Sequence, residues 1–87
     1  MNSEIKIDKS KILYEIMNDK TIILLESNNE VYSFDNVSKF IVDIILNSES
    51  ISISDIIDDV VATYEVSQDS AKKDTETFVS EFLNLFA

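Results

Sequence analysis

Three carboxylates, Asp55, Asp58 and Asp59, form the densest group of residues in this chain whose types and spacing could do chemistry. They fall on about one turn of a predicted helix, where carboxylate oxygens could share a metal ion. The opposite side of that helix is an apolar stripe, which is the pattern of a helix with one solvated face. We therefore interpret the three acids as a solvated surface and expect no metal site.

Asp69 and Ser70 form a second candidate, because they resemble the Asp-Ser start of the attachment site in acyl carrier proteins. The small size and acidity of the chain also fit a carrier. In carriers, however, the motif opens the second helix of an all-helical bundle and precedes an apolar residue larger than Ala71. Here it opens the last helix, after three predicted strands. An acyl carrier is therefore an alternative that the surrounding sequence disfavours.

The residue types that the chain lacks exclude most catalytic chemistry. It contains no His and no Cys, which removes thiol nucleophiles, Ser-His triads, zinc sites built on these residues and disulfides. It contains no Gly, so it has no Gly-rich phosphate loop. Seventeen acids against seven bases give a net charge of −10, whereas nucleic-acid binding normally needs a basic patch. We expect no enzyme activity, no cofactor and no nucleic-acid partner.

The length of 87 residues predicts a single domain, with residues 1–9 as a flexible N-terminal segment and residues 10–87 as the folded part. The N-terminus lacks the apolar core of a signal peptide. No apolar run reaches the roughly 18 residues of a membrane span. We expect a cytoplasmic protein without a membrane partner. Because Met1 is present and no enzyme domain is fused, we also expect a protein that stands alone.

Three strands are predicted in the first part of the chain. Residues 11–17 alternate weakly, residues 21–27 are rich in β-branched side chains, and residues 30–34 alternate between apolar and polar positions. Asn28 and Asn29 separate the last two strands. Asn tolerates a positive φ angle, so this pair predicts a two-residue hairpin turn and an antiparallel meander.

Three helices are predicted after the strands. Asp35, Ser52 and Ser67 are each placed to cap the start of one helix, and Ser52 with Asp55 resembles a capping box. Apolar residues recur behind each cap at helical spacing: Val37, Phe40, Ile41, Ile44 and Ile45, then Ile53, Ile56, Ile57, Val60 and Tyr64, then Ala71, Thr75, Phe78, Val79, Phe82 and Phe86. Strands followed by helices predict an α+β domain, with Ile57 and Phe82 in its core.

Apolar residues occupy both faces of the predicted sheet. In the first strand Leu13 and Met17 face away from its other apolar residues, and residues 22–25 are apolar without interruption. A sheet with one solvated face shows polar residues there, so we expect the second face to be covered. Two alternatives remain open. The N-terminal segment folds back with Ile5 and Ile7, or a partner protein or a dimer covers the face.

Three segments in this order resemble the PqqD-like family of ribosomal-peptide modification pathways. They are "VYSFDNVSKFIVDIILN" at 31–47, "SISDIIDDVVATYEV" at 52–66 and "VSEFLNLF" at 79–86. Tyr32, Phe34 and Asp35 occupy the positions of the strand end that leads into the first helix of the family. Asn47 and Glu65 depart from the pattern, because the family often has Gly at both positions.

The resemblance implies a winged helix-turn-helix-like fold and a RiPP recognition element. Such an element is a peptide chaperone that binds the leader segment of a precursor peptide. It implies two partners, the leader itself and a separate modifying enzyme or leader protease, such as one of a lasso-peptide pathway. In the family the leader adds as a strand beside the third strand and lies against the third helix. A winged-helix transcription regulator is the alternative from another class, and the net charge argues against it.

Carried onto this sequence, the resemblance implies a peptide-binding site made by the third strand and the third helix. Its residues are Glu30, Val31, Tyr32, Ser33 and Phe34 on the strand and Ala71, Lys72, Thr75, Phe78 and Val79 on the helix. Lys72 and Lys73 are expected to attract an acidic residue of the leader. Of the backbone N–H groups of Val31 and Ser33, we expect one to point outward for pairing and the other to face the middle strand.

Overall fold

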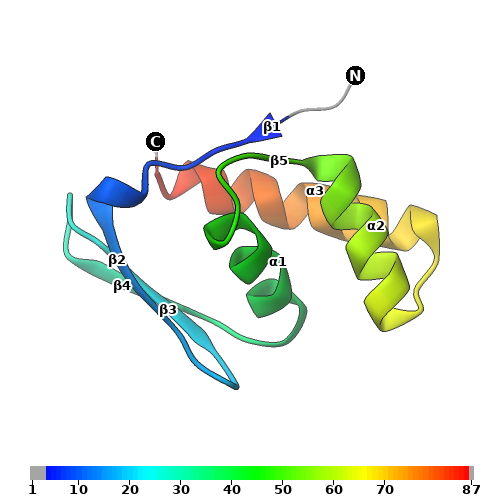
Figure 1. The fold of residues 1–87 in the computed structure, drawn as a ribbon, viewed down its shortest axis with the longest axis horizontal. Helices are drawn as coiled ribbons and strands as arrows, with labels where there is room; N and C mark the ends of the chain where they lie inside the picture. The colour runs from blue at the N-terminus through cyan, green and yellow to red at the C-terminus, as the bar shows by residue number, and fades with distance from the viewer. Residues whose placement is uncertain (1–3, 87) are drawn as a thin grey trace.

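The computed structural model describes residues 4–86, and it confirms an α+β fold in which a three-stranded sheet precedes three helices (Figure 1). The sheet contains β2 (Ile12–Ile16), β3 (Thr21–Leu25) and β4 (Glu30–Phe34), which pair antiparallel in the order β2-β3-β4. The helices are α1 (Asn36–Leu46), α2 (Ile53–Tyr64) and α3 (Gln68–Asn84). Both β2 and β4 are therefore edge strands of this sheet.

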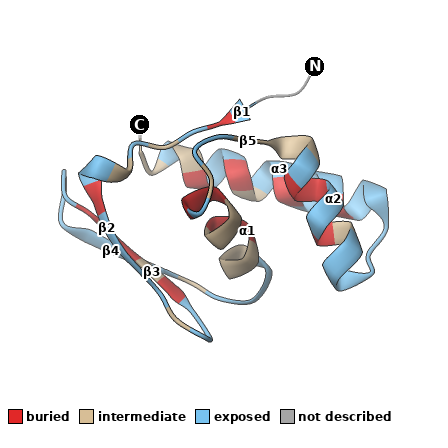
Figure 2. Ribbon diagram, in the orientation of Figure 1, coloured by how far each residue is buried: buried red, intermediate tan, exposed pale blue. Residues whose placement is uncertain are grey.

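The inner face of the sheet packs on the helices, and the core lies between them (Figure 2). Thr21, Ile23 and Leu25 of β3 point to this face and are buried, because successive strand residues alternate between faces. Ile57 and Phe82 are buried as well, which confirms their prediction as core residues. Thr21 is the polar residue among these three, and its hydroxyl donates a hydrogen bond to the Asp43 carboxylate on α1.

The helix starts agree with the predicted caps. The hydroxyl oxygens of Ser52 and Ser67 accept hydrogen bonds of 3.2 Å from the backbone N–H groups three residues later, at Asp55 and Ser70. Asp35 occupies the cap position of α1, but its side chain makes no capping hydrogen bond. Among residues 4–86, no helix combines the length and apolar character that crossing a bilayer requires.

The hairpin between β3 and β4 is longer than the predicted two-residue turn. Leu25 pairs with Glu30, so the connection has four residues, 26–29. Asn29 adopts a left-handed φ of 58°, and the Asn28 side-chain oxygen accepts a 2.9 Å hydrogen bond from the Glu30 N–H. The two asparagines therefore shape the turn, as their tolerance of such conformations predicts, but within a wider loop.

The N-terminal segment is packed on the helices, contrary to the expectation that residues 1–9 are loose. Strand β1 (Glu4–Ile5) pairs antiparallel with β5 (Ile51–Ser52), and Ile5 is only 2% exposed. The segment then enters a short 3-10 helix, η1 (Lys9–Lys11), where the Lys9 ammonium donates a 3.0 Å hydrogen bond to the Ser48 carbonyl. Residues 1–3 lie outside the described residues.

The outer face of the sheet is apolar and exposed. Leu13, Leu24 and Val31 stand directly opposite one another across the three strands, and Leu13 and Val31 are 60% and 63% exposed. Ile5 and Ile7 do not cover this face, because their segment packs on the helical side of the molecule (Figure 1). Of the two alternatives for the second face, the one based on the N-terminal segment is wrong.

Candidate functional site

The outward-facing backbone groups of β4 belong to Val31 and Ser33. The Glu26 N–H donates to the Lys11 carbonyl at 3.2 Å, and the Met17 N–H donates to the Lys20 carbonyl at 2.8 Å. The even-numbered residues of β3 therefore bond to β2, and its odd-numbered residues bond to β4. By the register of the strands, the backbone groups of Glu30, Tyr32 and Phe34 are those that face β3.

Val31 and Ser33 consequently present a row of N–H and C=O groups at the open edge. Because they are two residues apart, both point the same way, and the expectation that one of them faces the middle strand is wrong. No other strand within residues 4–86 pairs with this edge. An incoming peptide strand can satisfy these groups by main-chain hydrogen bonds.

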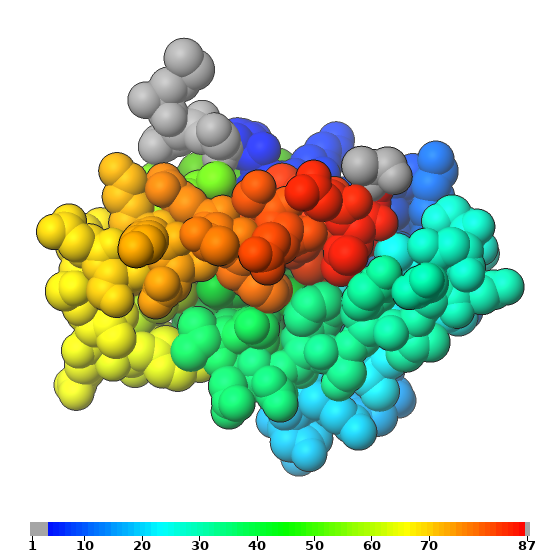
Figure 3. Space-filling model, turned by 180° about the vertical axis from the view of Figure 1, so that it is seen from behind, coloured from blue at the N-terminus to red at the C-terminus, as the bar shows by residue number. Residues whose placement is uncertain are grey.

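An aromatic wall lies beside this edge. The ring of Phe34 packs edge-on against the rings of Phe78 and Phe82, with centroids 6.0 and 5.6 Å apart. Phe82 in turn contacts Phe86 at 5.1 Å, one turn further along α3. Figure 3 shows the result from behind, with α3 running alongside α1 and β4 on one face of the molecule. Aromatic pairs of this geometry fix the distance and angle between the strand and the helix.

A hollow of about 240 Å³ continues this wall toward the start of α3. Phe78 belongs to both features, and the hollow is otherwise lined by residues of all three helices and the α2–α3 connection: Val37, Ser38, Ile41, Val60, Tyr64, Val66, Ser70, Ala71, Asp74 and Thr75. An apolar cavity of about 150 Å³ admits benzene, so this one has room for an aromatic or branched side chain. Val37, Tyr64 and Val66 are exposed at its rim.

The structure brings most of the sequence-predicted site together. All five strand residues lie on β4, and Phe78 is half-buried in the wall beside it. Ala71 and Thr75 are buried but line the floor of the hollow. Val79 is buried and does not line the hollow, so its part is to support the helix packing.

Lys72 stands apart from the other predicted site residues. At about 100° per residue, Lys72 and Lys73 lie about 120° and 140° around α3 from Phe78. Lys72 is exposed and does not line the hollow, whereas Asp74, which lies about 40° from Phe78, does. The side of α3 that borders the wall is therefore acidic, and the two lysines face elsewhere.

Sequence reasoning missed Asp74, Val37, Tyr64 and Val66 as lining residues. Asp74 was detectable, because a residue four positions before Phe78 shares its side of a helix. The other three belong to α1, α2 and the α2–α3 connection, and only the packing of the helices brings them to the start of α3.

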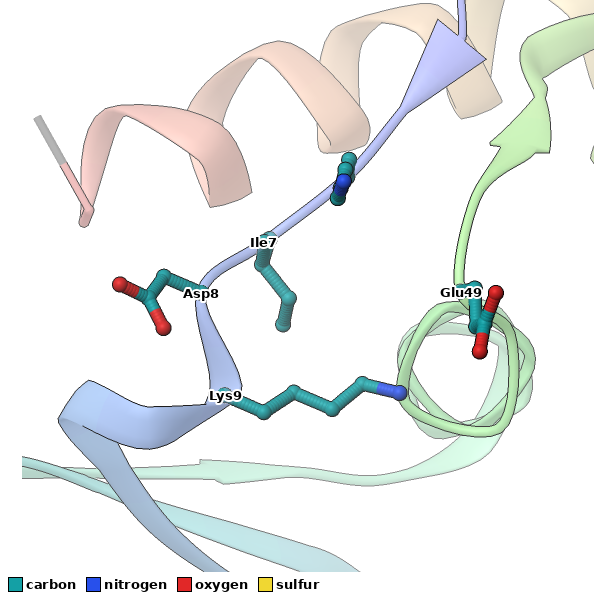
Figure 4. Close-up of a pocket in the computed structure, with 5 residues that line it drawn as sticks. Ile7, Asp8, Lys9 and Glu49 are labelled. Carbon is teal, nitrogen blue, oxygen red and sulfur yellow. The ribbon is translucent and has the colours of Figure 1, made fainter.

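Two further surface features lie within residues 4–86. Asp55, Asp58 and Asp59 are exposed on α2, and residues 4–86 contain no cluster of three or more metal-ligating side chains. A wide hollow of about 770 Å³ lies at the N-terminal segment, where Lys9 reaches across toward the end of α1 (Figure 4). Its lining mixes both charges, Lys6 and Lys9 with Asp8 and Glu49.

The Tyr32 hydroxyl is the titratable group of β4 whose environment is perturbed. It donates a 3.3 Å hydrogen bond to a Glu30 carboxylate oxygen. Partial burial and the adjacent Glu30 charge raise the pKa of Tyr32 above its ordinary value, so the phenol stays protonated at neutral pH. Tyr32 therefore acts in this site as an apolar surface with a hydrogen-bonding tip, not as a base.

Comparisons with known proteins agree with this fold. The solved structure of TbiB1 in complex with the TbiA(beta) leader peptide superposes with a TM-score of 0.81 at 19% identity, covering 92% of this chain and 90% of that one. Among curated proteins no match is found. The family model for coenzyme PQQ synthesis protein D (PqqD) matches residues 17–85, most of the sheet and all three helices. The chain belongs to the PqqD family.

Proposed function

We propose that this protein binds the leader segment of a ribosomally made precursor peptide, without catalysing a reaction itself. The observation that carries the proposal is the open edge of β4, with Val31 and Ser33 facing outward beside the wall of Phe34 and Phe78. Membership of the PqqD family supports it, as does the likeness to TbiB1, whose solved complex contains a leader peptide.

The leader adds as a fourth strand to the sheet. Its main chain bonds to Val31 and Ser33, and alternate side chains point toward α3, where the wall and the hollow receive them. Main-chain pairing tolerates many sequences, whereas the hollow selects for apolar side chains of suitable size. We expect a dissociation constant between about 10 nM and 10 μM, equivalent to roughly −11 to −7 kcal/mol.

The bound leader is delivered to a separate modifying enzyme or leader protease, and a leader protease of a lasso-peptide pathway is one such enzyme. The row of Leu13, Leu24 and Val31 on the outer sheet face, in which Leu13 and Val31 are exposed, is the surface that we assign to this second protein or to a second copy of the chain. A leader strand at β4 extends that same face, so a protein docked there contacts both.

Proline substitutions at the two edges of the sheet test the proposal. Ser33→Pro removes an outward N–H from β4 while leaving the β3–β4 hydrogen bonds in place. Ile16→Pro is the matched control, because the Ile16 N–H points outward from β2. The probe is a fluorescein-labelled synthetic leader of a candidate precursor peptide, read by fluorescence anisotropy, with circular dichroism to verify the fold of each variant.

Ser33→Pro is expected to weaken binding more than tenfold, and Ile16→Pro less than twofold. Val31→Pro should repeat the loss, since Val31 also faces outward. A folded Ser33→Pro variant that binds the leader like wild type would contradict docking at β4.

A further inference from the structure

The aromatic wall of Phe34 and Phe78 is flanked by carboxylates on both α3 and β4. Asp74 and Glu81 lie four residues before and three residues after Phe78, so they share its side of α3, about 40° and 60° from it. On the strand, Glu30 points to the same face of β4 as Tyr32 and Phe34. All three acids are exposed.

These carboxylates are not neutralised by lysines of the protein. Within residues 4–86 the one ion pair shorter than 4 Å joins Lys39 to Asp43 and involves none of these three acids. Lys72 and Lys73 lie on other sides of α3. Glu30 accepts a hydrogen bond from the Tyr32 hydroxyl, which leaves its charge intact. The apolar wall is therefore bordered by unpaired negative charge, in a protein of net charge −10.

On the basis of the proposed function, we propose that the leader recognised here is basic, with Lys or Arg two positions to either side of a central apolar residue. The expectation that Lys72 and Lys73 attract an acidic leader is thereby reversed. Asp74 and Glu81 are separated by seven residues, or about 10 Å along α3. Strand residues on one face repeat every 6–7 Å or so, so residues i and i+4 lie about 13 Å apart with i+2 between them.

This strand spacing is close to the separation of the two carboxylates along α3. The central apolar side chain meets Phe78 and Phe34, while long basic side chains at i and i+4 reach the carboxylates of Asp74 and Glu81. The flexibility of Lys and Arg side chains covers the difference between about 10 and 13 Å. The net charge of the protein also accelerates the encounter with a cationic peptide.

The test is selection from a phage-displayed library of random 12-residue peptides on the immobilised full chain. The expected result is at least a threefold excess of Lys and Arg over Asp and Glu at the positions flanking an apolar residue by two. The best peptide is then synthesised with a fluorescein label and titrated in 50 mM salt. Asp74→Asn combined with Glu81→Gln should weaken it about tenfold.

A matched control separates the local charge from the net charge. Asp58→Asn with Asp59→Asn removes two exposed carboxylates from α2, the same change in net charge, and should weaken binding less than twofold. Equal losses of peptide affinity in the two double variants would overturn the proposal.

The selection also distinguishes the two proposals. If the selected peptides do not bind Ser33→Pro but are neutral or acidic, the proposal of a basic leader is wrong, whereas the proposal of docking at β4 is retained. If their binding survives Ser33→Pro, or if no peptide is enriched, docking at β4 is itself contradicted, and the charge proposal falls with it.

Discussion

The two edges of the three-stranded sheet have the same length and the same neighbour, yet they differ in what lies beside them. Ile16 of β2 and Phe34 of β4 both pair with Thr21 of the middle strand. Ile16 is 40% exposed, whereas Phe34 packs against Phe78 and Phe82 of α3. Both strands present unpaired backbone groups, but only β4 combines them with an apolar wall.

The difference shows what turns an exposed edge into a receptor. A bare edge pairs with any strand and is a liability, which short length and charged side chains keep in check. β2 fits this description, with five residues, four of them exposed, and Glu15 among them. β4 adds side-chain selectivity to main-chain pairing, because alternate residues of an added strand meet α3.

Phe34 and Ile16 both pair with Thr21, and replacing each by Ala should give the largest difference in unfolding free energy between the two edges. Phe34→Ala removes a ring from contact with Phe78 and Phe82, and we expect it to cost about 2–4 kcal/mol of unfolding free energy. Ile16→Ala should cost less than about 1 kcal/mol, since much of that side chain is already in water. Urea denaturation measures both, and equal losses would mean that the wall does not distinguish the edges.

Thr21 joins the sheet to α1 through the hydrogen bond of its hydroxyl to Asp43. The next prediction concerns the contribution of this hydrogen bond to stability. Thr21→Val keeps the shape of this fully buried side chain but removes the donor to the Asp43 carboxylate, which then retains Lys39 as its partner. We expect a loss of about 1–3 kcal/mol in denaturant unfolding. Thr21→Ser, which keeps the hydroxyl, should lose less. The reverse order would show that the methyl group, not the hydrogen bond, holds the contact.

A variant of Phe78 compares the two edges by their effect on leader binding instead of stability. Phe78→Ala removes the half-buried ring that belongs to both the wall and the hollow. We expect the dissociation constant of the leader to rise about tenfold, or roughly 1.4 kcal/mol, in fluorescence anisotropy. Tyr14→Ala on the β2 edge is the control and should change it less than twofold. An unchanged dissociation constant with Phe78→Ala would place the leader elsewhere.

The smallest effects are expected where the edges are alike. Leu13 and Val31 are similarly exposed on the outer face, and each replacement by Ala should change the unfolding free energy by less than about 0.5 kcal/mol. Thermal melting of the isolated protein measures this. A large loss of unfolding free energy at either position would show that the outer face is covered in the folded protein, for example by the second copy in a stable dimer.

The sequence predicted the parts of the fold that repeat with a period. The apolar stripes of the three helices and the caps at Ser52 and Ser67 lie where expected, because helical spacing and capping chemistry are local. Strands β1 and β5 were not predicted, since two residues carry no alternation. Their pairing, with Ile5 in the core, depends on contacts between distant segments.

The site was predicted only as far as the strand and the buried stripe define it. Val31 through Phe34 and Phe78 were assigned, but Lys72 was predicted as a site residue and Asp74, which lines the hollow, was not. A helix stripe shows which side of α3 is buried, and it does not show which neighbouring side borders β4. That choice follows from the contact of Phe34 with Phe78 and Phe82, which no local pattern encodes.

Amide hydrogen exchange of the protein with and without its leader tests docking at β4 most directly. The outward N–H groups of Val31 and Ser33 exchange with solvent in the free protein and become hydrogen bonded in the complex, whereas those of Tyr14 and Ile16 on β2 do not change partners. Exchange read by NMR should therefore slow at least tenfold at Val31 and Ser33 and stay within twofold at Tyr14 and Ile16. Protection at Tyr14 and Ile16 with none at Val31 and Ser33 would contradict it.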